Sequence, residues 1–260
     1  MFEPGAISPG PSGLADWPRP FVFRAMHLDG RTFAAGYTFH FDLNLFDTTT
    51  SSVAYLVLTF AQVAREGLGP GRRKVELTRV VQLDGSGEAG AAVYQNGLMS
   101  EQSVAPLEFD LSAQPKPVSR LRMRFVTPTE LKNGQQIVAR PEFGILAARV
   151  RDRISTLREL YGDGALDIDF RAFGERASSV EMTRCEIEKV DVRRRSSRTG
   201  QVHSIGGFVG EAEYEGELAE FLPYLKVAQW TGVGRQTVWG KGVIEINPSS
   251  PSTDADTTGC

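Results

Sequence analysis

The sequence contains little of what several protein classes require. Only two cysteines and three histidines occur among 260 residues. This excludes a disulfide framework and gives no spacing typical of a zinc site. No run approaches the roughly 20 apolar residues of a membrane-spanning helix, so we expect no membrane partner. The start of the chain, MFEPGAISPGPSGLADWPRP, lacks the basic and apolar regions of a signal peptide. We therefore expect a cytoplasmic protein.

An excess of charge of one sign is also missing. The net charge is −3 at pH 7, so the whole molecule has no positive field that would attract nucleic acid. Any site for a polyanion must be a local patch. Otherwise the composition is that of a globular protein, with 41% hydrophobic and 23% charged residues. The length allows one large domain or two of ordinary size.

An internal repeat is the most informative feature that is present. Each half of the chain contains two strands, a helix, a glycine-rich turn and a further strand. In the second half, a strand and a helix precede this series and complete a βαββαβ, or ferredoxin-like, unit. We therefore predict an α+β fold of tandem ferredoxin-like domains with antiparallel sheets, in which the first domain lacks its opening strand and helix. The predicted parts are a lead-in at 1–19, a partial domain at 20–84, a structured linker at 85–117, a complete domain at 118–246 and a disordered tail at 247–260.

The glycine-rich turn of the second half reads GVGRQTVWGKG, and its glycines are Gly232, Gly234, Gly240 and Gly242. Glycine permits positive φ and lets a backbone approach a ligand closely, and exposed backbone N–H groups can bind phosphate. Arg235 and Lys241 add positive charge at the same place, and Trp239 is suited to stack on a base. The alternative is that these glycines only form the turn between helix and strand.

Two further basic segments are candidates for phosphate contact. The turn of the first half, GLGPGRRK, contains Gly67, Gly69, Gly71, Arg72, Arg73 and Lys74. The alternative for this segment is a helix C-cap followed by a solvated basic strand end. In VDVRRRSSRTGQVH, the tip of a predicted hairpin carries Arg193, Arg194, Arg195 and Arg198. Guanidinium groups at such a tip suit contacts that position RNA without reading its sequence, although charged tips are also common in solvated loops.

These motifs resemble a known family. Two ferredoxin-like units, each with a glycine-rich turn between the last helix and the last strand, are similar to the repeat-associated mysterious protein (RAMP) superfamily. The run from GGFVGEAEYEG to GVGRQTVWGKG resembles the C-terminal domain of the CRISPR-associated endoribonuclease that cuts precursor crRNA. LRMRFVTPTELKNG and GYTFHFDLNLFD resemble upstream blocks of the same family, and the likeness covers roughly residues 18–246.

The resemblance implies an RNA-binding protein and a metal-independent endoribonuclease that leaves a 2′,3′-cyclic phosphate, with no cofactor. It also implies CRISPR repeat RNA as partner and other CRISPR-associated proteins as further partners. The exposed sheet edge expected for the incomplete first domain leaves room for a homodimer. The reaction needs a general base, an acid and cationic support, and histidine suits the first two roles near neutral pH. Among the three histidines we select His40 as catalytic, with Lys74 as electrostatic support, over His27 and His203.

Three alternatives stay open at this point. In family members that cut, the active-site histidine usually lies on or near the first helix, which this sequence lacks. The natural start can therefore lie further upstream, or the catalytic constellation can be unusual, or the chain is a catalytically inactive subunit that binds crRNA or supports assembly. A different class is a ferredoxin-like protein used only for protein–protein assembly, which would show no salt-dependent affinity for RNA.

Overall fold

The computed structural model describes residues 17–69, 71–102, 104–113, 116–195, 200, 202–204 and 206–249. These residues form two compact units. The larger unit contains the described residues up to Asn44 and those from Asp110 onward, and the smaller unit is Leu45–Phe109. Residues 20–44, which the sequence assigns to the first domain, are thus part of the larger unit.

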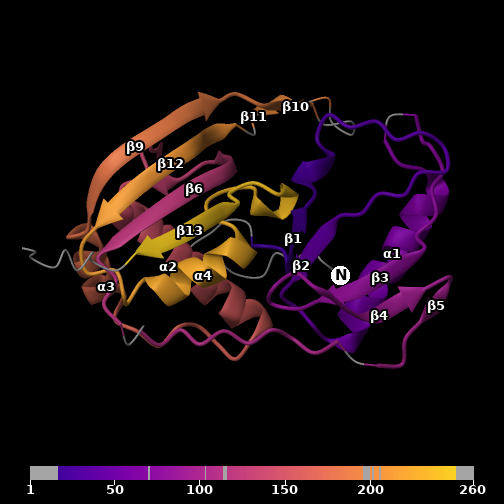
Figure 1. Ribbon diagram of the computed structural model, residues 1–260, viewed down its shortest axis with the longest axis horizontal. Coiled ribbons are helices and arrows are strands. Elements are labelled where there is room, and N and C mark those ends of the chain that lie inside the picture. Colours follow the sequence, from indigo (N-terminus) through magenta and orange to yellow (C-terminus); the bar gives the residue numbers. More distant parts are fainter. Residues whose placement is uncertain are drawn as a thin grey trace, which may run out of the picture. The chain divides into compact units, whose positions relative to one another are not determined.

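A four-stranded antiparallel sheet in the order β13-β6-β12-β9 forms the centre of the larger unit (Figure 1). Helix α2 connects the first two of these strands along the chain, and helix α4 connects the last two. This is the predicted βαββαβ unit, and the α+β fold class with antiparallel sheets is confirmed. The bounds are β6 Arg120–Thr129, α2 Phe143–Tyr161, β9 Glu181–Val190, β12 Gly207–Glu215, α4 Leu222–Thr231 and β13 Ile244–Ser249.

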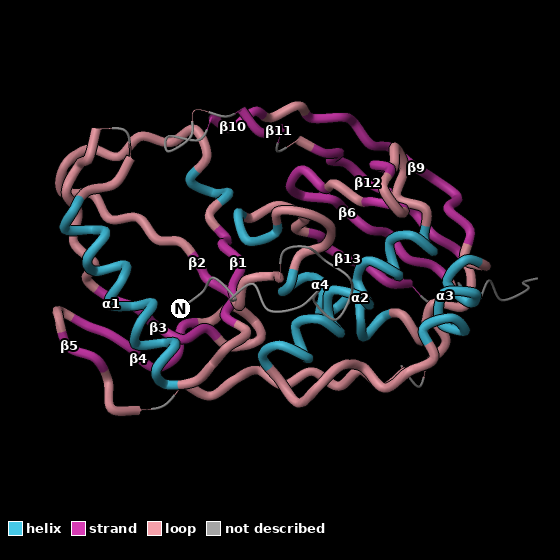
Figure 2. The backbone as a smooth tube through the Cα atoms, turned by 180° about the vertical axis from the view of Figure 1, so that it is seen from behind, coloured by secondary structure: helices cyan, strands magenta, loops and turns pink. Residues whose placement is uncertain are grey.

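Strict alternation along β6 shows why the sheet has one buried face. Leu121, Met123 and Phe125 are buried, whereas the residues between them are exposed. The buried face packs against α2, α4 and the short helix α3, Phe170–Ser178, which are seen in front of the sheet in Figure 2. Aromatic rings meet edge to face in this core, as Phe143 and Phe173 each do with Phe221 at centroid distances of 5.2 and 4.9 Å.

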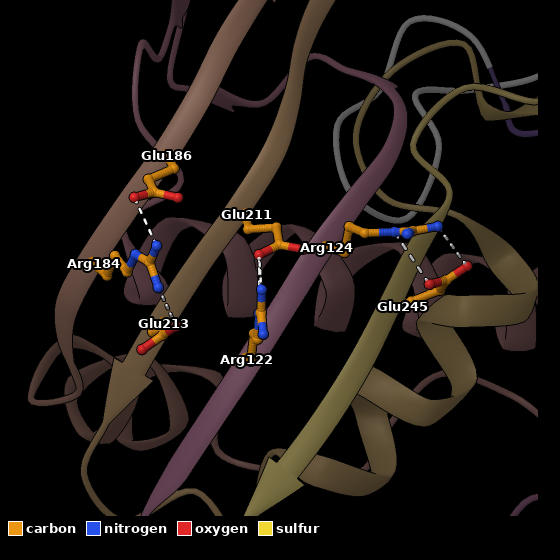
Figure 3. A network of polar contacts seen from close by, with 7 residues as sticks. All are labelled: Arg122, Arg124, Arg184, Glu186, Glu211, Glu213 and Glu245. Carbon is orange, nitrogen blue, oxygen red and sulfur yellow. Dashed lines mark hydrogen bonds and ion pairs between the residues drawn. The ribbon is translucent and has the colours of Figure 1, made fainter.

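The opposite face of the sheet carries a ladder of arginines and glutamates, drawn in Figure 3. Each pair lies across neighbouring strands or two residues apart on one strand. The pairs are Arg122 Nε with Glu211 at 2.9 Å, Arg124 Nε with Glu245 at 3.2 Å, Arg184 with Glu186 at 2.8 Å and with Glu213 at 3.2 Å, and Arg120 with Glu215 at 3.1 Å. We use the name sheet-face ladder for these residues.

Three elements of the larger unit differ from the sequence prediction. Helix α3 was not predicted; Asp169 caps it by accepting hydrogen bonds from the N–H groups of Arg171 and Ala172. The small hairpin of β7, Lys132–Asn133, and β8, Gln136–Ile137, was not predicted either. Strand β13 extends to Ser249, so it includes the first residues of the expected tail, whereas 250–260 lie outside the described residues, as do 1–16 of the lead-in.

The predicted arginine-rich hairpin is present. Strand β10, Arg193–Arg195, pairs antiparallel with β11, Val202–Ser204, and joins β9 to β12. Arg198 lies outside the described residues.

The N-terminal segment of the larger unit consists of β1, Phe21–Arg24, the 3-10 turn η1, Met26–Leu28, and β2, Asp42–Leu45, which pairs with β1. The alternation of apolar and polar residues in GYTFHFDLNLFD, residues 36–47, predicts a longer strand that begins at Gly36. Residues 37–41 are not in a strand, because their aromatic side chains do not all face a core. Tyr37 is 74% exposed, and Phe39 packs on Phe33 at a centroid distance of 5.2 Å.

The smaller unit consists of one helix and a three-stranded antiparallel sheet in the order β3-β4-β5. Val57 of the helix packs with Val93 and Tyr94 of the sheet. The last two strands lie in the expected linker, and Asn96 and Gly97, both at positive φ, form the tight turn between them. The elements are α1 Thr50–Glu66, β3 Arg79–Leu83, β4 Ala89–Gln95 and β5 Leu98–Met99.

Candidate nucleic-acid interface

The glycine-rich loop, residues 232–242, connects the C-terminus of α4 to β13 and includes the 3-10 turn η2, Thr237–Trp239. All four predicted glycines have positive φ, between 67° and 81°. A Cβ at Gly242 would overlap the carbonyl oxygen of Val233, and one at Gly234 would overlap that of Glu130. The space that these glycines leave is therefore filled by the protein backbone itself. This gives the loop a structural reason for glycine that is independent of any ligand.

The end of β6 holds the loop in place through hydrogen bonds. The N–H groups of Arg235 and Gly242 donate to the carbonyl oxygens of Glu130 and Pro128, at 3.1 and 3.2 Å. The Thr127 hydroxyl donates to the Gly240 carbonyl oxygen at 2.9 Å and accepts from the N–H of Val243 at 3.0 Å. Within the described part of the chain, the N–H groups of Gly234, Thr237, Val238 and Lys241 meet no hydrogen-bond acceptor. Thr237 is buried, so the N–H groups of the partly exposed Gly234, Val238 and Lys241 are the backbone donors that the loop can offer to a phosphate.

The loop's charged and aromatic side chains have different surroundings. Arg235 is half-exposed, and its Nη1 pairs with Oε1 of the nearly buried Glu130 at 2.6 Å. Burial lowers the pKa of the half-buried Lys241 ammonium, an effect that Asp29 opposes. The side chain of Trp239 is 47% exposed, which leaves an aromatic surface at the loop.

The arginine-rich hairpin lies at the same end of the sheet as the loop. In β12, Phe208 pairs with Thr129 near the end of β6, and the hairpin directly precedes β12. The loop precedes β13, whose Ile244 pairs with Phe125 of the same strand β6. Because antiparallel register fixes these positions, the two segments that the sequence singles out are brought to one end of the sheet.

Two of the three histidines form a pair in the N-terminal segment. Nε2 of His27 donates to the backbone carbonyl oxygen of His40 at 2.8 Å, and the two rings stack with centroids 4.7 Å apart. Since a carbonyl oxygen can only accept, His27 carries its proton on Nε2. Both side chains are exposed, and within the described residues no hydrogen bond reaches either ring nitrogen of His40. His203 pairs with Arg194 in the β10–β11 hairpin.

The histidine pair and the glycine-rich loop lie on neighbouring segments. Asp29, two residues after His27, is close enough to Lys241 to act on its charge. On the other side of η1, the carbonyl oxygen of Phe23 lies 3.1 Å from where a Cβ of Gly240 would be. Lys74, the expected electrostatic support of His40, belongs to the smaller unit.

The first-half turn has the geometry of a helix C-cap and a closed loop. Gly67, at φ 105°, caps α1 through its N–H to the Val63 carbonyl, and Leu68 exchanges backbone hydrogen bonds of 2.8 and 3.0 Å with Arg73. Gly69 also has positive φ, whereas Gly71 does not. Arg72, Arg73 and Lys74 are exposed and form no ion pair with any residue that the structure describes.

Sequence reasoning missed the residues that hold the glycine-rich loop. Thr127 and Glu130 lie in the TPTE segment, and its position at the end of strand β6 was the available signal. Arg24, Asn44 and Arg153 donate to the end of α4, and no local pattern marks them, because their partners are up to 206 residues away.

Two general properties of the described residues complete this account. They contain no helix that is both long and apolar enough to cross a bilayer. They also contain no group of three or more His, Cys, Asp or Glu side chains arranged to hold a metal ion.

Comparison with known proteins adds two family models. Residues 123–244 match the model of the CRISPR-associated endoribonuclease Cas6, and residues 1–107 match a model described as an N-terminal domain. Among curated proteins, no sequence matches this chain.

Solved structures of Cas6 have a similar fold. The chain matches a product complex of a Thermus thermophilus Cas6 with a TM-score of 0.54 and 20% identity, over 88% of this chain and 82% of that one. The match to another structure of the same Cas6 has a TM-score of 0.39 and 19% identity, over 51% of this chain and 55% of that one. A second Cas6 product complex gives 0.36 and 24%, over 52% and 53%. In these two matches the chain thus spans about half the length of the Cas6 protein.

The family match covers β6 from Met123 to its end, the arginine-rich hairpin and the whole glycine-rich loop. Residues 123–244 thus match the family model of the CRISPR-associated endoribonuclease Cas6, and the chain shares its fold with a solved Cas6 structure.

Proposed function

We propose that this chain binds CRISPR repeat RNA at the end of the sheet where β6 terminates, and cleaves precursor crRNA within its repeats. The observation that carries the proposal is the position of the glycine-rich loop and the arginine-rich hairpin at this one end, inside the residues that match Cas6. The loop offers backbone N–H donors, Lys241 and the exposed Trp239, and the hairpin offers Arg193, Arg194 and Arg195. Phosphate contacts of this kind position an RNA, and an aromatic ring can stack on one of its bases.

The proposed reaction is transesterification without a metal ion. The ribose 2′-oxygen bonds to the adjacent phosphorus, the bond from phosphorus to the 5′-oxygen breaks, and a 2′,3′-cyclic phosphate remains. A base must take the proton of the 2′-hydroxyl, and the leaving 5′-oxygen must gain a proton. His40 is our candidate base, because its exposed ring has both nitrogens available. His27 holds the backbone of His40 and stacks on its ring, which restricts the orientation of the imidazole.

Cationic support for the reaction would come from Lys241, through a charge near the negatively charged phosphorane. The basic residues of the first-half turn, Arg72, Arg73 and Lys74, are proposed as additional phosphate contacts on the smaller unit. Gly67, Gly69 and Gly71 are proposed to shape that turn.

The test is incubation of the protein with a labelled CRISPR repeat RNA in EDTA, beside a His40→Ala variant. Loss of a general base typically slows such a step by about 10²–10⁴-fold. An Arg171→Ala variant is the control, because Arg171 lies on α3 and is 89% exposed at the side chain. We expect cleavage to a cyclic phosphate end by the wild type and the control, and at least about a hundredfold slower cleavage by His40→Ala.

The other outcomes identify which part of the proposal fails. Unchanged cleavage by His40→Ala would retain the nuclease and reject His40. Binding without cleavage by the wild type would favour a catalytically inactive crRNA-binding or assembly subunit. Absence of salt-dependent binding would reject the RNA interface altogether.

A further inference from the structure

Three side chains from distant parts of the larger unit meet at the last turn of α4, directly before Gly232. Arg24 comes from β1, Asn44 from β2 and Arg153 from α2, and each donates to a main-chain carbonyl oxygen. The bonds are Arg24 Nη2 to Gln229 at 2.8 Å and to Trp230 at 3.1 Å, Asn44 Nδ2 to Trp230 at 2.7 Å, and Arg153 Nε to Thr231 at 2.9 Å.

These contacts satisfy groups that the helix itself cannot satisfy. The last four carbonyl groups of an α-helix have no partner within the helix, and they form the negative end of its dipole. Donors with positive charge are therefore favourable at this end. Two guanidinium groups and one amide together bind the last three carbonyls of α4, and the glycine-rich loop begins at the next residue.

The arrangement is not that of an anion site. Neither Arg24 nor Arg153 forms an ion pair with a carboxylate among the described residues, and an anion placed between them would face the negative end of α4. Burial of both guanidinium groups lowers the pKa of each to about 10, and the charge of Arg24 lowers that of Arg153 further. The donors that bind the end of α4 are thus Arg24 Nη2 and Arg153 Nε, whereas Arg24 Nη1 is buried and meets no hydrogen-bond acceptor among the described residues.

Strand β1 also reaches the other end of the loop. The carbonyl oxygen of Phe23 lies 3.1 Å from the position that a Cβ of Gly240 would take. Phe23 and Arg24 are consecutive, so one short strand contacts the loop near Gly240 and holds the helix end from which the loop starts. The N-terminal segment thus restricts the position of both ends of the loop.

We propose that Arg24 and Asn44 are positioning residues for the glycine-rich loop, through which the N-terminal segment determines how well the loop binds RNA without contacting the RNA itself. The RNA part of this inference rests on the proposed function. The positioning part concerns the free protein and can be tested in the absence of RNA.

The first experiment measures hydrogen exchange of the free protein by mass spectrometry. In the loop, the N–H groups of Val233, Arg235 and Gly242 are bound to backbone carbonyls and should be protected. We expect Arg24→Met to accelerate exchange of the peptide covering 232–242 by about tenfold, because two buried hydrogen bonds are lost. Exchange of peptides from α2 and β9 should remain within about twofold of wild type. Asn44→Ala, which removes one bond and no charge, should give about a threefold change and serves if Arg24→Met does not fold.

The second experiment measures affinity for repeat RNA at several salt concentrations. A positioning residue changes the fraction of molecules with a competent loop, so it weakens binding without changing the dependence on salt. A residue that contacts phosphate instead reduces the slope of log K against log salt by about 0.7–0.9. We expect about tenfold weaker binding with an unchanged slope for Arg24→Met, a reduced slope for Lys241→Ala, and wild-type behaviour for Arg171→Met, which removes an exposed arginine on α3.

Each result is decisive. Wild-type exchange of the loop in both Arg24→Met and Asn44→Ala would overturn the inference. A reduced salt slope in Arg24→Met would show a direct phosphate contact and would also overturn it. If the wild type binds no RNA, the proposed function fails, and the exchange experiment alone then decides whether these residues position the loop.

Discussion

Substitution of Gly242 by alanine tests why glycine is needed in the loop. Gly242 has φ 67°, and a Cβ there would overlap the carbonyl oxygen of Val233, whose N–H in turn donates to the Gly242 carbonyl at 2.9 Å. If the glycines served only to let RNA approach, an alanine would leave the free protein stable and would weaken RNA binding alone. The structure predicts instead that the free protein itself is destabilised.

A matched control separates the two costs of this substitution. Gly30 has φ 69°, almost the same as Gly242, but nothing lies within 4 Å of a Cβ built on it. Gly30→Ala should therefore cost only the strain of a left-handed conformation, about 1–2 kcal/mol. Gly242→Ala should cost this strain plus the displacement of a backbone oxygen, about 1–3 kcal/mol more if it resembles overpacking in a core.

The assay is thermal and urea unfolding of both variants without RNA, followed by circular dichroism. For a unit of this size, each kcal/mol lowers Tm by roughly 2–4 °C, so the two variants should differ by roughly 2–12 °C. Equal Tm values for Gly242→Ala and Gly30→Ala would refute the reasoning, because the overlap with Val233 would then have no energetic consequence. A stable Gly242→Ala protein that no longer binds RNA would assign the glycine to the ligand and not to the turn.

Two further predictions concern charge. The first is a double-mutant cycle with Arg122→Ala and Glu211→Ala on the sheet-face ladder. The coupling energy measured by urea unfolding should be about 0.2–1 kcal/mol, since the pair is solvent-exposed. RNA affinity should not change, and a large loss of affinity would place RNA on this face. Affinity for a repeat RNA that lacks the 2′-hydroxyl at the cleavage site should fall as pH rises toward 10.5, and should fall at lower pH in wild type than in Lys241→Arg. Burial lowers the pKa of Lys241, so its charge is lost at a lower pH than that of an ordinary lysine, whereas arginine stays charged. Identical pH profiles of the two proteins would contradict a role for this charge in binding.

The sequence predicted those helices and strands whose apolar residues recur at a regular spacing. Alternation in β6 and the spacing of apolar residues in α2 predicted these elements, because one face of each is buried in the same core. Alternation failed for residues 36–41, where the same pattern arises from aromatic side chains that do not all reach a core. Helix α3 was missed although Asp169 caps it and Phe173 and Ala177 lie on one buried face, because the helix has only nine residues.

The candidate site was predictable to the same degree. The glycine spacing and the arginine-rich tip were visible in the sequence, and the register of the sheet brings them to one end. The ion pairs that basic side chains form with distant carboxylates were not visible in the sequence. Arg235 was expected as a phosphate contact, but it is held by Glu130, which lies 105 residues away in the chain. The stacking of His27 on His40 was likewise not predictable. Most of the 12 residues between them form an irregular loop, and the sequence does not determine where such a loop returns.

The positions of the arginines within the larger unit argue for where RNA can bind. Arginine is frequent both on the face of the sheet and at its end, so the number of basic residues does not distinguish these surfaces. On the face, Arg122, Arg124 and Arg184 each pair with a glutamate (Figure 3), and Arg120 pairs with Glu215. The five glutamates of the ladder exceed its four arginines and leave it with an excess of negative charge: they are Glu186, Glu211, Glu213, Glu215 and Glu245. A phosphate approaching the face would have to displace a glutamate from every arginine it contacts and would meet the repulsion of the others. At the end of the sheet, the loop presents Lys241, unpaired backbone N–H groups and an exposed indole beside a hairpin of consecutive arginines. Electrostatics within this unit therefore directs a polyanion to the end of the sheet and away from its open face.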